Sequence, residues 1–263
     1  MNRRASRLCF SLIVSCCFLA APAAQVDQAT AVLAAARIAM GGEQKLAAIK
    51  TLVITGRTRQ LRGDNVVPIE FETNIEFPSK YVRKDESPLE ESDPTTAGFS
   101  GDALIQVPAP AAPAPARVAA VKAEFTRLML GLIAASPALP LTFVHAGKAE
   151  APQGKADVLD ATGEGFSARL FISEDTHLPF MLSWHAAPAR GRGGRGGSGV
   201  GGGEPAAAAA EQRLYFSDYR VVSGQQLPFR IRRATGADTV EETTVDRYRV
   251  NSKIDPRKFQ PAK

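Results

Sequence analysis

The chain of 263 residues has three histidines that could act as general bases or metal ligands, His145, His177 and His185. None lies in an H-E-x-x-H motif or at the short spacing of a paired metal site. The segment GFSGD at 98–102 is not the G-x-S-x-G elbow of a serine hydrolase, because its second glycine comes one position early. We therefore interpret each histidine as a residue of a sheet face or a loop.

Carboxylates are the next candidates for chemistry. Glu70, Glu72 and Glu76 could supply the paired acids of glycoside hydrolysis. They alternate along one predicted strand, however, so a solvated surface explains them. Asp218 lies two positions from Arg220, and an ion pair beside a hairpin explains that pattern as well. The sequence thus predicts no enzyme, no metal site and no cofactor.

The segment RGRGGRGG at 190–197 is similar to arginine–glycine segments that bind nucleic acid. This segment has no interleaved aromatic residues. Three of the five net positive charges of the chain lie in residues 1–7, within the predicted leader. We therefore predict no nucleic-acid partner. The surrounding stretch has no hydrophobic periodicity, so we expect a disordered Gly/Arg-rich loop over 188–210.

The N-terminal segment predicts export. Three arginines and no acid occupy the first seven residues, an apolar run spans 8–20, and A-P-A follows at 21–23. This order is typical of a secretory signal peptide, and the apolar run is shorter than the ~20 residues that span a bilayer. We predict a signal peptide over 1–23 and a periplasmic protein.

All three cysteines, Cys9, Cys16 and Cys17, lie in that segment. The exported chain is therefore predicted to contain no disulfide. An alternative is a lipoprotein signal in which Cys16 is acylated. Cleavage there would leave an apolar core of only residues 8–15, so we favour ordinary cleavage after Ala23.

Two segments predict amphipathic helices. The first lies within 27–50, where the apolar positions are Ala29, Val32, Leu33, Ala36 and Met40. The second spans 116–137 and ends at Pro137; its apolar stripe is Val118, Val121, Phe125, Leu128, Met129, Leu132 and Ile133. The opposite, polar face of the second helix holds Arg117, Lys122, Glu124 and Arg127.

The remaining segments predict strands of one antiparallel sheet with a dry and a wet face. The clearest alternation runs over 66–77, and GFSGDALIQV at 98–107 predicts a further short strand. From Leu139 onward almost every segment predicts a strand, as expected of a meander. In FSDYRVVSGQQLPFRIR, the turn of a hairpin is expected at Ser223 to Gln226. We expect a single α+β domain over 24–263.

A long one-sided sheet that curves presents an apolar trough, which the helices cover in part. A concave apolar cleft is the usual form of a ligand site. The same side chains could instead be core. The candidate lining residues are Ile69, Phe71, Ile75, Phe77, Leu170, Ile172, Phe180, Leu182, Trp184, Phe229 and Ile231.

Several motifs carry a family resemblance: AMGGEQKLAAIKTLVITGR, EFPSKYVR, ARLFISEDTHLPFMLSW, FSDYRVVSGQQLP and NSKIDPRKF. In their order the chain resembles the periplasmic outer-membrane lipoprotein-sorting (LolA/LolB-like) superfamily. The resemblance implies an unclosed half-barrel of antiparallel strands with helices packed in its concavity, which receives acyl chains. It does not carry over the cargo, since one fold hosts many functions.

We therefore predict a monomeric, exported protein that binds a hydrophobic ligand such as the acyl chain of a lipid or lipoprotein. The alternative is a periplasmic interaction or sensor module whose trough is filled by its own helices. In that case an envelope protein would contact the acidic loop from Glu86 to Asp93 or the Gly/Arg-rich loop.

Overall fold

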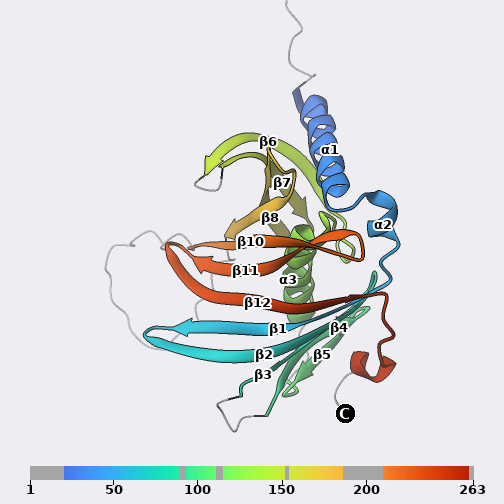
Figure 1. Cartoon of the computed structure of the whole chain (residues 1–263), viewed down its shortest axis with the longest axis vertical. Coiled ribbons are helices and arrows are strands. Elements are labelled where there is room, and N and C mark those ends of the chain that lie inside the picture. Colours follow the sequence, from blue (N-terminus) through green and yellow to red (C-terminus); the bar gives the residue numbers. More distant parts are fainter. Residues whose placement is uncertain (1–20, 89–92, 111–114, 152–153, 186–209, 261–263) are drawn as a thin grey trace, which may run out of the picture.

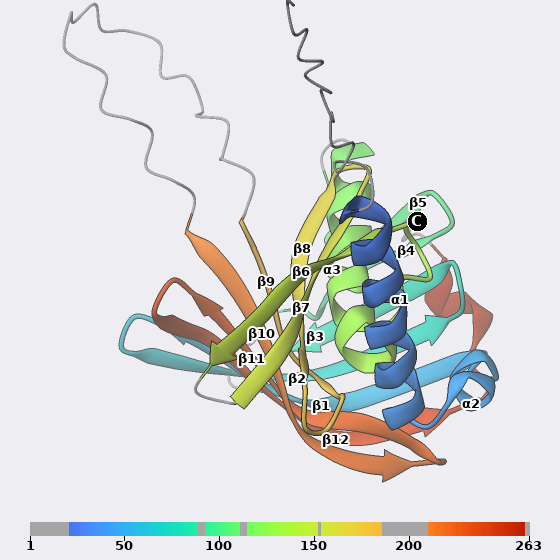
Figure 2. The same cartoon turned by 90° about the horizontal axis from the view of Figure 1, so that it is seen from above.

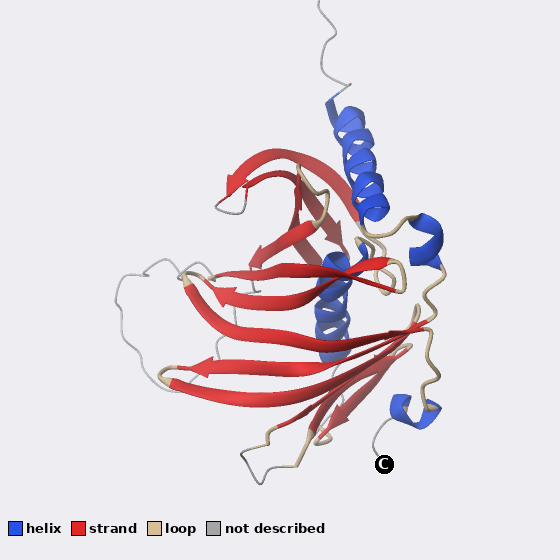
Figure 3. Cartoon of the chain, viewed as in Figure 1, coloured by secondary structure: helices blue, strands red, loops and turns tan. Residues whose placement is uncertain are grey.

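The computed structural model describes residues 21–88, 93–110, 115–151, 154–185 and 210–260. They form one twelve-stranded antiparallel sheet with its two long helices on one side (Figures 1 and 3). The helices are α1 (Ala21–Ala39), α2 (Glu43–Ala47), α3 (Pro115–Ile133) and a short 3-10 helix, η1 (Pro256–Phe259). The strands are β1 (Thr51–Arg62), β2 (Asn65–Glu76), β3 (Lys80–Glu86), β4 (Thr95–Ser100), β5 (Ala103–Val107), β6 (Thr142–Ala151), β7 (Gly154–Gly163), β8 (Phe166–Ser173), β9 (Pro179–His185), β10 (Glu211–Val222), β11 (Gln225–Thr235) and β12 (Asp238–Val250).

The strand order is β5-β4-β3-β2-β1-β12-β11-β10-β9-β8-β7-β6. The first and last strands of the chain therefore pair in the middle of the sheet, and β5 and β6 are its two edges. The chain passes from one edge to the other through α3, which lies inside the curved sheet (Figure 2). The predicted α+β fold, an unclosed curved sheet with helices in its concavity, is confirmed.

The alternation predicted for β2 places its two faces as expected. Phe71, Thr73 and Ile75 are buried toward α3, whereas Glu70 is exposed on the outer face. Asn74 also belongs to the outer face but is buried, because the C-terminal segment covers that end of the sheet. The pattern of β2 therefore shows which side of the whole sheet faces the core.

The hairpin of β10 and β11 turns at Ser223 and Gly224, which have φ of 52° and 82°. Two consecutive residues with positive φ form the type I′ turn that suits the twist of paired strands. The prediction of a turn within Ser223 to Gln226 is confirmed. Pro228, which lacks a donor, lies where β11 pairs with β10 alone, because pairing with β12 begins only at Arg230.

Two of the sequence motifs meet at this turn. The backbone N–H of Gln226 donates to the carbonyl of Met40 at 2.9 Å, which docks the end of α1 on the hairpin. Gly41 has φ of 126°, and a Cβ there would lie 2.5 Å from the carbonyl oxygen of Gly224. Only glycine allows this approach. The GG of AMGGEQKL and the SG of the hairpin are therefore packing partners.

The C-terminal motif NSKIDPRKF is a clasp on the outer face. The Asn251 side chain accepts from the backbone N–H of Lys50 at 2.7 Å and donates to the carbonyl of Ala48 at 3.0 Å. Asp255 caps η1, and Phe259 packs in a small second cluster with Val82, Ile105 and Ile254. The chain end thereby joins β1 to the far side of β3 and β5.

Three boundaries differ from the predictions. α1 begins at Ala21 rather than within 27–50, because the alanines and Pro22 of its first turn favour helix. GFSGDALIQV is not one strand: Gly101, with φ of 61°, turns the chain between β4 and β5. α3 ends at Ile133, four residues before Pro137. Residues 1–20 of the predicted leader lie outside the described residues, as does the predicted loop except for its last residue, Ala210.

Candidate functional site: the concavity under the third helix

The concave face of the sheet is closed by α3, whose apolar stripe lies on it as predicted. The ring of Phe125 lies between those of Tyr81 and Phe99, with centroids 5.1 and 5.4 Å away. Thr126, Leu130 and Gly131, which lie beyond the predicted stripe, are buried too. A helix inside a concavity is enclosed on more than one side, so its buried face is wider than that of a helix on a flat sheet.

Most of the predicted lining residues meet in one cluster around α3. Those buried in it are Phe71, Ile75, Leu170, Ile172, Leu182, Trp184 and Phe229. Phe77 and Ile231 are half-buried and pack against the same cluster. The residues chosen from the sequence thus share one face, and α3 covers that face.

Ile69 and Phe180 do not join this cluster. The register of β8 and β9 shifts between Phe171 and Ile172, and Phe180 is the unpaired residue opposite the shift. Its ring lies beside that of Phe171, 6.3 Å away, instead of beside Leu182. The strict alternation predicted for Phe180, Leu182 and Trp184 is therefore wrong at Phe180, where the strand is irregular.

A cavity of about 80 Å³ remains between α3 and the sheet. It has room for a few water molecules, and pockets that hold small ligands are usually several times larger, roughly 300–1,000 Å³. Its wall contains charged side chains among aromatic ones: Arg83, Glu124, Arg233 and Glu241 beside Phe71, Tyr81 and Tyr248. Burial raises the pKa of the Tyr81 phenol to about 12. The space between α3 and the sheet is therefore too small for an acyl chain while α3 stays in place, and the wall of the remaining cavity is partly polar.

Glu124 of α3 holds the helix to the sheet by charge. Its carboxylate accepts from Arg233 of β11 at 2.8 Å and from Arg127, one turn along α3, at 2.7 Å. The guanidinium of Arg127 lies 4.5 Å from the ring centroid of Trp184. Burial, opposed by the charge of Glu124, holds the pKa of Arg127 below its ordinary value. The sequence placed Glu124 and Arg127 on the solvent face, and that expectation is wrong for Arg127.

The contact between α3 and the sheet also contains polar atoms without partners. Neither the hydroxyl of Thr126 nor Nε of Arg127 has a hydrogen-bond partner among the described residues, although both atoms are buried. Each such atom costs roughly 1–3 kcal/mol relative to its solvated state. Separation of α3 from the sheet would recover this cost, so the interface is less stable than its apolar area suggests.

The end of α3 is clasped by β10. Phe216 packs directly against Gly131, where a Cβ would lie 2.1 Å from the ring. The hydroxyl of Tyr219 contacts the carbonyls of Gly131, at 3.1 Å, and Pro179, at 2.6 Å. Asp218 has φ of 57°, which breaks the alternation and lets Phe216 and Tyr219 both face the helix. The D-Y-R sequence of the hairpin therefore positions α3.

The other residues singled out from the sequence have structural environments. His145 is buried in β6, and its Nε2 lies 2.9 Å from Oδ1 of Asp157. His177 and His185 are exposed, in a turn and at the end of β9. The predicted ion pair between Asp218 and Arg220 is present at 2.6 Å.

Within the described ranges, no group of three or more potential metal ligands is assembled. Over the same residues, no helix has the length and apolar character needed to cross a membrane.

Sequence could not identify the charged groups inside the hollow. Arg83 and Arg233 lie at inward positions of β3 and β11, yet each is flanked by further charged residues, so neither departs visibly from a solvated pattern. Only contacts across the fold show that these positions face inward: Arg233 pairs with Glu124, and Arg83 donates to the hydroxyl of Thr58 on β1.

No protein-family model matches the chain, and no curated protein matches its sequence. Solved structures match in shape. The LolA superfamily protein NE2245 from Nitrosomonas europaea is 12% identical, with a TM-score of 0.56 over 88% of this chain and 97% of that chain. A DUF1329 family protein from Desulfovibrio piger is 10% identical, with a TM-score of 0.52 over 88% and 97%. A putative outer membrane lipoprotein-sorting protein domain from Vibrio parahaemolyticus is 8% identical, with a TM-score of 0.50 over 89% and 97%.

At these identities the likeness concerns the fold. The chain has the LolA-like fold, as its motifs predicted.

Proposed function

We propose that this protein is an exported, non-catalytic binder of acyl chains, in which α3 covers the binding face and moves aside for the ligand. The observation that carries the proposal is the position of α3: it is a connection between the two sheet edges, and it occupies the hollow that the fold creates. The leader-like first 23 residues support export. A lipid or the acyl chains of a lipoprotein would be the cargo.

The energies of helix and ligand are comparable. Burial of one large apolar side chain contributes roughly 1.5–3 kcal/mol, so Phe125, Met129, Leu130, Leu132 and Ile133 contribute on the order of 10 kcal/mol together. A palmitoyl chain that buries about 14 methylenes at ~0.8 kcal/mol each contributes on the order of 11 kcal/mol. An acyl chain can therefore replace the helix on the same face, provided that the rest of the interface opposes it little.

The polar part of the interface meets that condition. Ion pairs that are partly exposed contribute little, roughly 0–1 kcal/mol. The side chains of Glu124 and Arg233 are 44% and 26% exposed, so their pair orients α3 more than it stabilises it. The unpartnered hydroxyl of Thr126 favours separation. Together these groups make α3 a removable cover.

The single tryptophan of the chain reports on this movement. Trp184 is 6% exposed and lies under Arg127. We expect palmitate to shift its emission in a saturable way, whereas butyrate, which buries few methylenes, should leave the emission unchanged at the same concentration. An identical spectrum with and without palmitate, together with no displacement of a lipid dye, would refute acyl-chain binding.

A second experiment identifies the cargo. Protein purified from its own cell envelope and examined by native mass spectrometry should carry a co-purifying lipid or acylated species. A ligand-free protein in complex with an envelope protein would instead support the interaction module considered from the sequence.

A further inference from the structure

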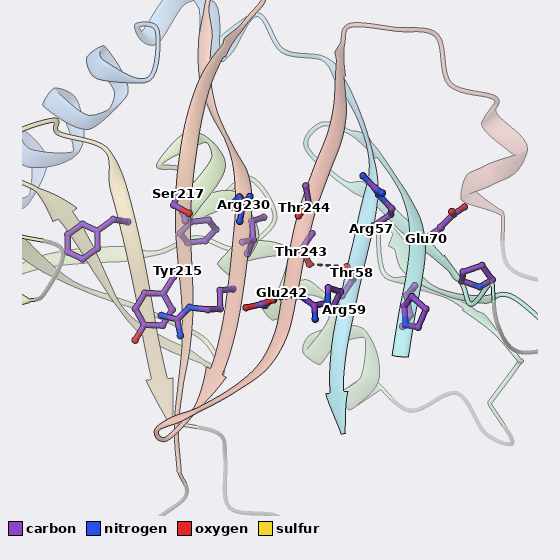
Figure 4. A pocket seen from close by; sticks show the side chains of 17 residues that line it. Arg57, Thr58, Arg59, Glu70, Tyr215, Ser217, Arg230, Glu242, Thr243 and Thr244 are labelled. Atoms are coloured by element: carbon purple, nitrogen blue, oxygen red, sulfur yellow. Dashed lines mark hydrogen bonds and ion pairs between the residues drawn. The ribbon is translucent and has the colours of Figure 1, made fainter. Parts of the chain in front are cut away.

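A second hollow, larger than the cavity under α3, lies elsewhere on the sheet. It is a groove of about 680 Å³ on the outer face of the sheet, and it crosses β2, β1, β12, β11 and β10 (Figure 4). Thr58 and Thr243, whose hydroxyls lie 2.9 Å apart, are buried on the side of α3, so their neighbours along each strand point outward. Ile69, Phe216 and Ile231 of the inner face also border the groove, so it adjoins the proposed acyl-chain site, whereas its outward side chains lie on the opposite face of the sheet.

Two parallel rows of outward side chains line the groove. One row follows the register from Pro68 through Arg59, Glu242 and Arg232 to Tyr215. The other follows Glu70, Arg57, Thr244, Arg230 and Ser217. Pro88 lines one end and Phe180 the other. The floor is sheet backbone whose ladder hydrogen bonds are already made, so a ligand has to be recognised by the side chains.

The lining of the groove carries a net positive charge, because it contains four arginines and two glutamates. Arg59 pairs with Glu242 at 3.2 Å and Arg57 with Asp246 at 3.0 Å. Arg230 is exposed and has no ion pair among the described residues. It therefore presents to the groove a guanidinium that is outside any ion pair, next to Thr244 and within the electrostatic reach of the Asp218 carboxylate. A complementary ligand is acidic.

The apolar parts lie at the ends. The ring of Tyr215 is stacked under the guanidinium of Arg232 at 4.0 Å and adjoins the half-buried Phe180. Pro68 and Pro88 form the opposite end. Aromatic-lined grooves of this kind suit extended, proline-rich segments.

The spacing of the cations selects the conformation of the ligand. Arg57 and Arg230 lie on β1 and β11, two strands apart, which is roughly 9.6 Å at ~4.8 Å per strand. In a polyproline II segment, side chains three residues apart share a face and lie about 9.3 Å apart. Two acids with that spacing would therefore reach both guanidinium groups at once.

We propose that this groove docks an extended, acidic segment of an envelope protein, with two carboxylates three residues apart over Arg57 and Arg230 and an apolar side chain beside Phe180 and Tyr215. The proposal does not depend on acyl-chain binding, which is proposed for the other face.

The test uses the full chain and fluorescent peptides. FPPEPPEPP should bind, whereas FPPQPPQPP and FPPEPPPEP, with neutral or misplaced acids, should bind at least tenfold more weakly. Arg230→Gln should weaken binding of FPPEPPEPP about tenfold, as expected for loss of a charged hydrogen bond. Arg247→Gln removes the same charge from an exposed position of β12 that does not line the groove, and should change binding less than twofold.

Three results would overturn the proposal: equal binding of the three peptides, equal effects of the two substitutions, or Arg230-dependent binding of phosphatidylglycerol vesicles or inorganic phosphate without peptide binding. The last result would assign the groove to a phosphate group. The response of Trp184 to palmitate should be the same in both variants, so failure here leaves the acyl-chain site untouched.

Discussion

Replacement of Gly131 by alanine tests the contact that holds α3 in the concavity. A Cβ at this position would lie 2.1, 2.2 and 2.5 Å from three ring atoms of Phe216, whereas ordinary contact begins at 3.4 Å. The helix or the ring must therefore move by more than 1 Å. Overpacking of this kind costs roughly 1–3 kcal/mol. Alanine in place of a helical glycine returns about 1 kcal/mol of helix propensity.

The net effect should be a loss of about 1 kcal/mol in the free energy of unfolding, since the clash exceeds the propensity gain. Urea unfolding followed by Trp184 fluorescence measures it. Because the displaced helix uncovers the sheet, Gly131→Ala should also bind palmitate more tightly than the unmodified protein, about fivefold for 1 kcal/mol.

In the control background, Gly131→Ala should change the free energy of unfolding in the opposite direction. Phe216→Leu removes the ring atoms that the new methyl group meets, so Gly131→Ala in that background should stabilise the protein by up to about 1 kcal/mol through propensity alone. The reasoning would be refuted if Gly131→Ala stabilised both backgrounds equally, or if it destabilised the native protein without any change in palmitate affinity.

Three further changes test other contacts. Glu124→Gln, which removes the charge that Arg233 and Arg127 share, should tighten palmitate binding by up to about fivefold in a fluorescence titration, because at most about 1 kcal/mol of helix docking is lost. Asn251→Ala should lower the free energy of unfolding by roughly 2 kcal/mol, since it removes hydrogen bonds at a residue with φ of 55°. The pKa of Asp255, lowered to about 2 by hydrogen bonds from Arg257, predicts an NMR titration near that pH; the clasp is then fully formed above pH 4 and loosens as the pH falls toward 2.

The two substitutions have matched controls. Glu164→Gln removes the same charge from the exposed turn between β7 and β8, so it should leave palmitate affinity unchanged. Asn251→Gly keeps the freedom to adopt positive φ and should cost less stability than Asn251→Ala. Equal effects within either pair would contradict the roles given to Glu124 and Asn251, and an Asp255 titration near 4 would contradict its contact with Arg257.

The strands could be predicted from sequence because one face of the sheet is dry. The alternation of apolar and polar residues in β2 and β8 matches the burial of these strands in the structure. The Ser223-Gly224 pair predicts the turn that these two residues form. Where local rules change, prediction failed. Gly101 divides the one expected strand into β4 and β5. The irregularity at Phe180 interrupts the predicted alternation of β9, and composition alone does not reveal such an irregularity.

For the candidate site, the sequence could predict which side chains share one face of the sheet, but not how that face is covered. Leu170, Leu182 and Trp184 do share it, but the sequence could not show how fully α3 covers it, because that depends on Gly131 accepting the ring of Phe216. The outer groove was invisible for a similar reason. Arg57 and Arg230 are 173 positions apart in the chain, and only the pairing of β1 and β11 with β12 brings them into one row.

Tethering α3 to the sheet tests the central claim most directly. The described residues contain no cysteine, so a variant with Glu124→Cys and Arg233→Cys, and with serine at positions 9, 16 and 17, can be joined by a short bis-thiosulfonate crosslinker that a reductant releases. The crosslinked protein should not bind palmitate in isothermal titration, and reduction should restore binding in the same sample. Equal palmitate affinity before and after release would show that the ligand does not enter beneath α3.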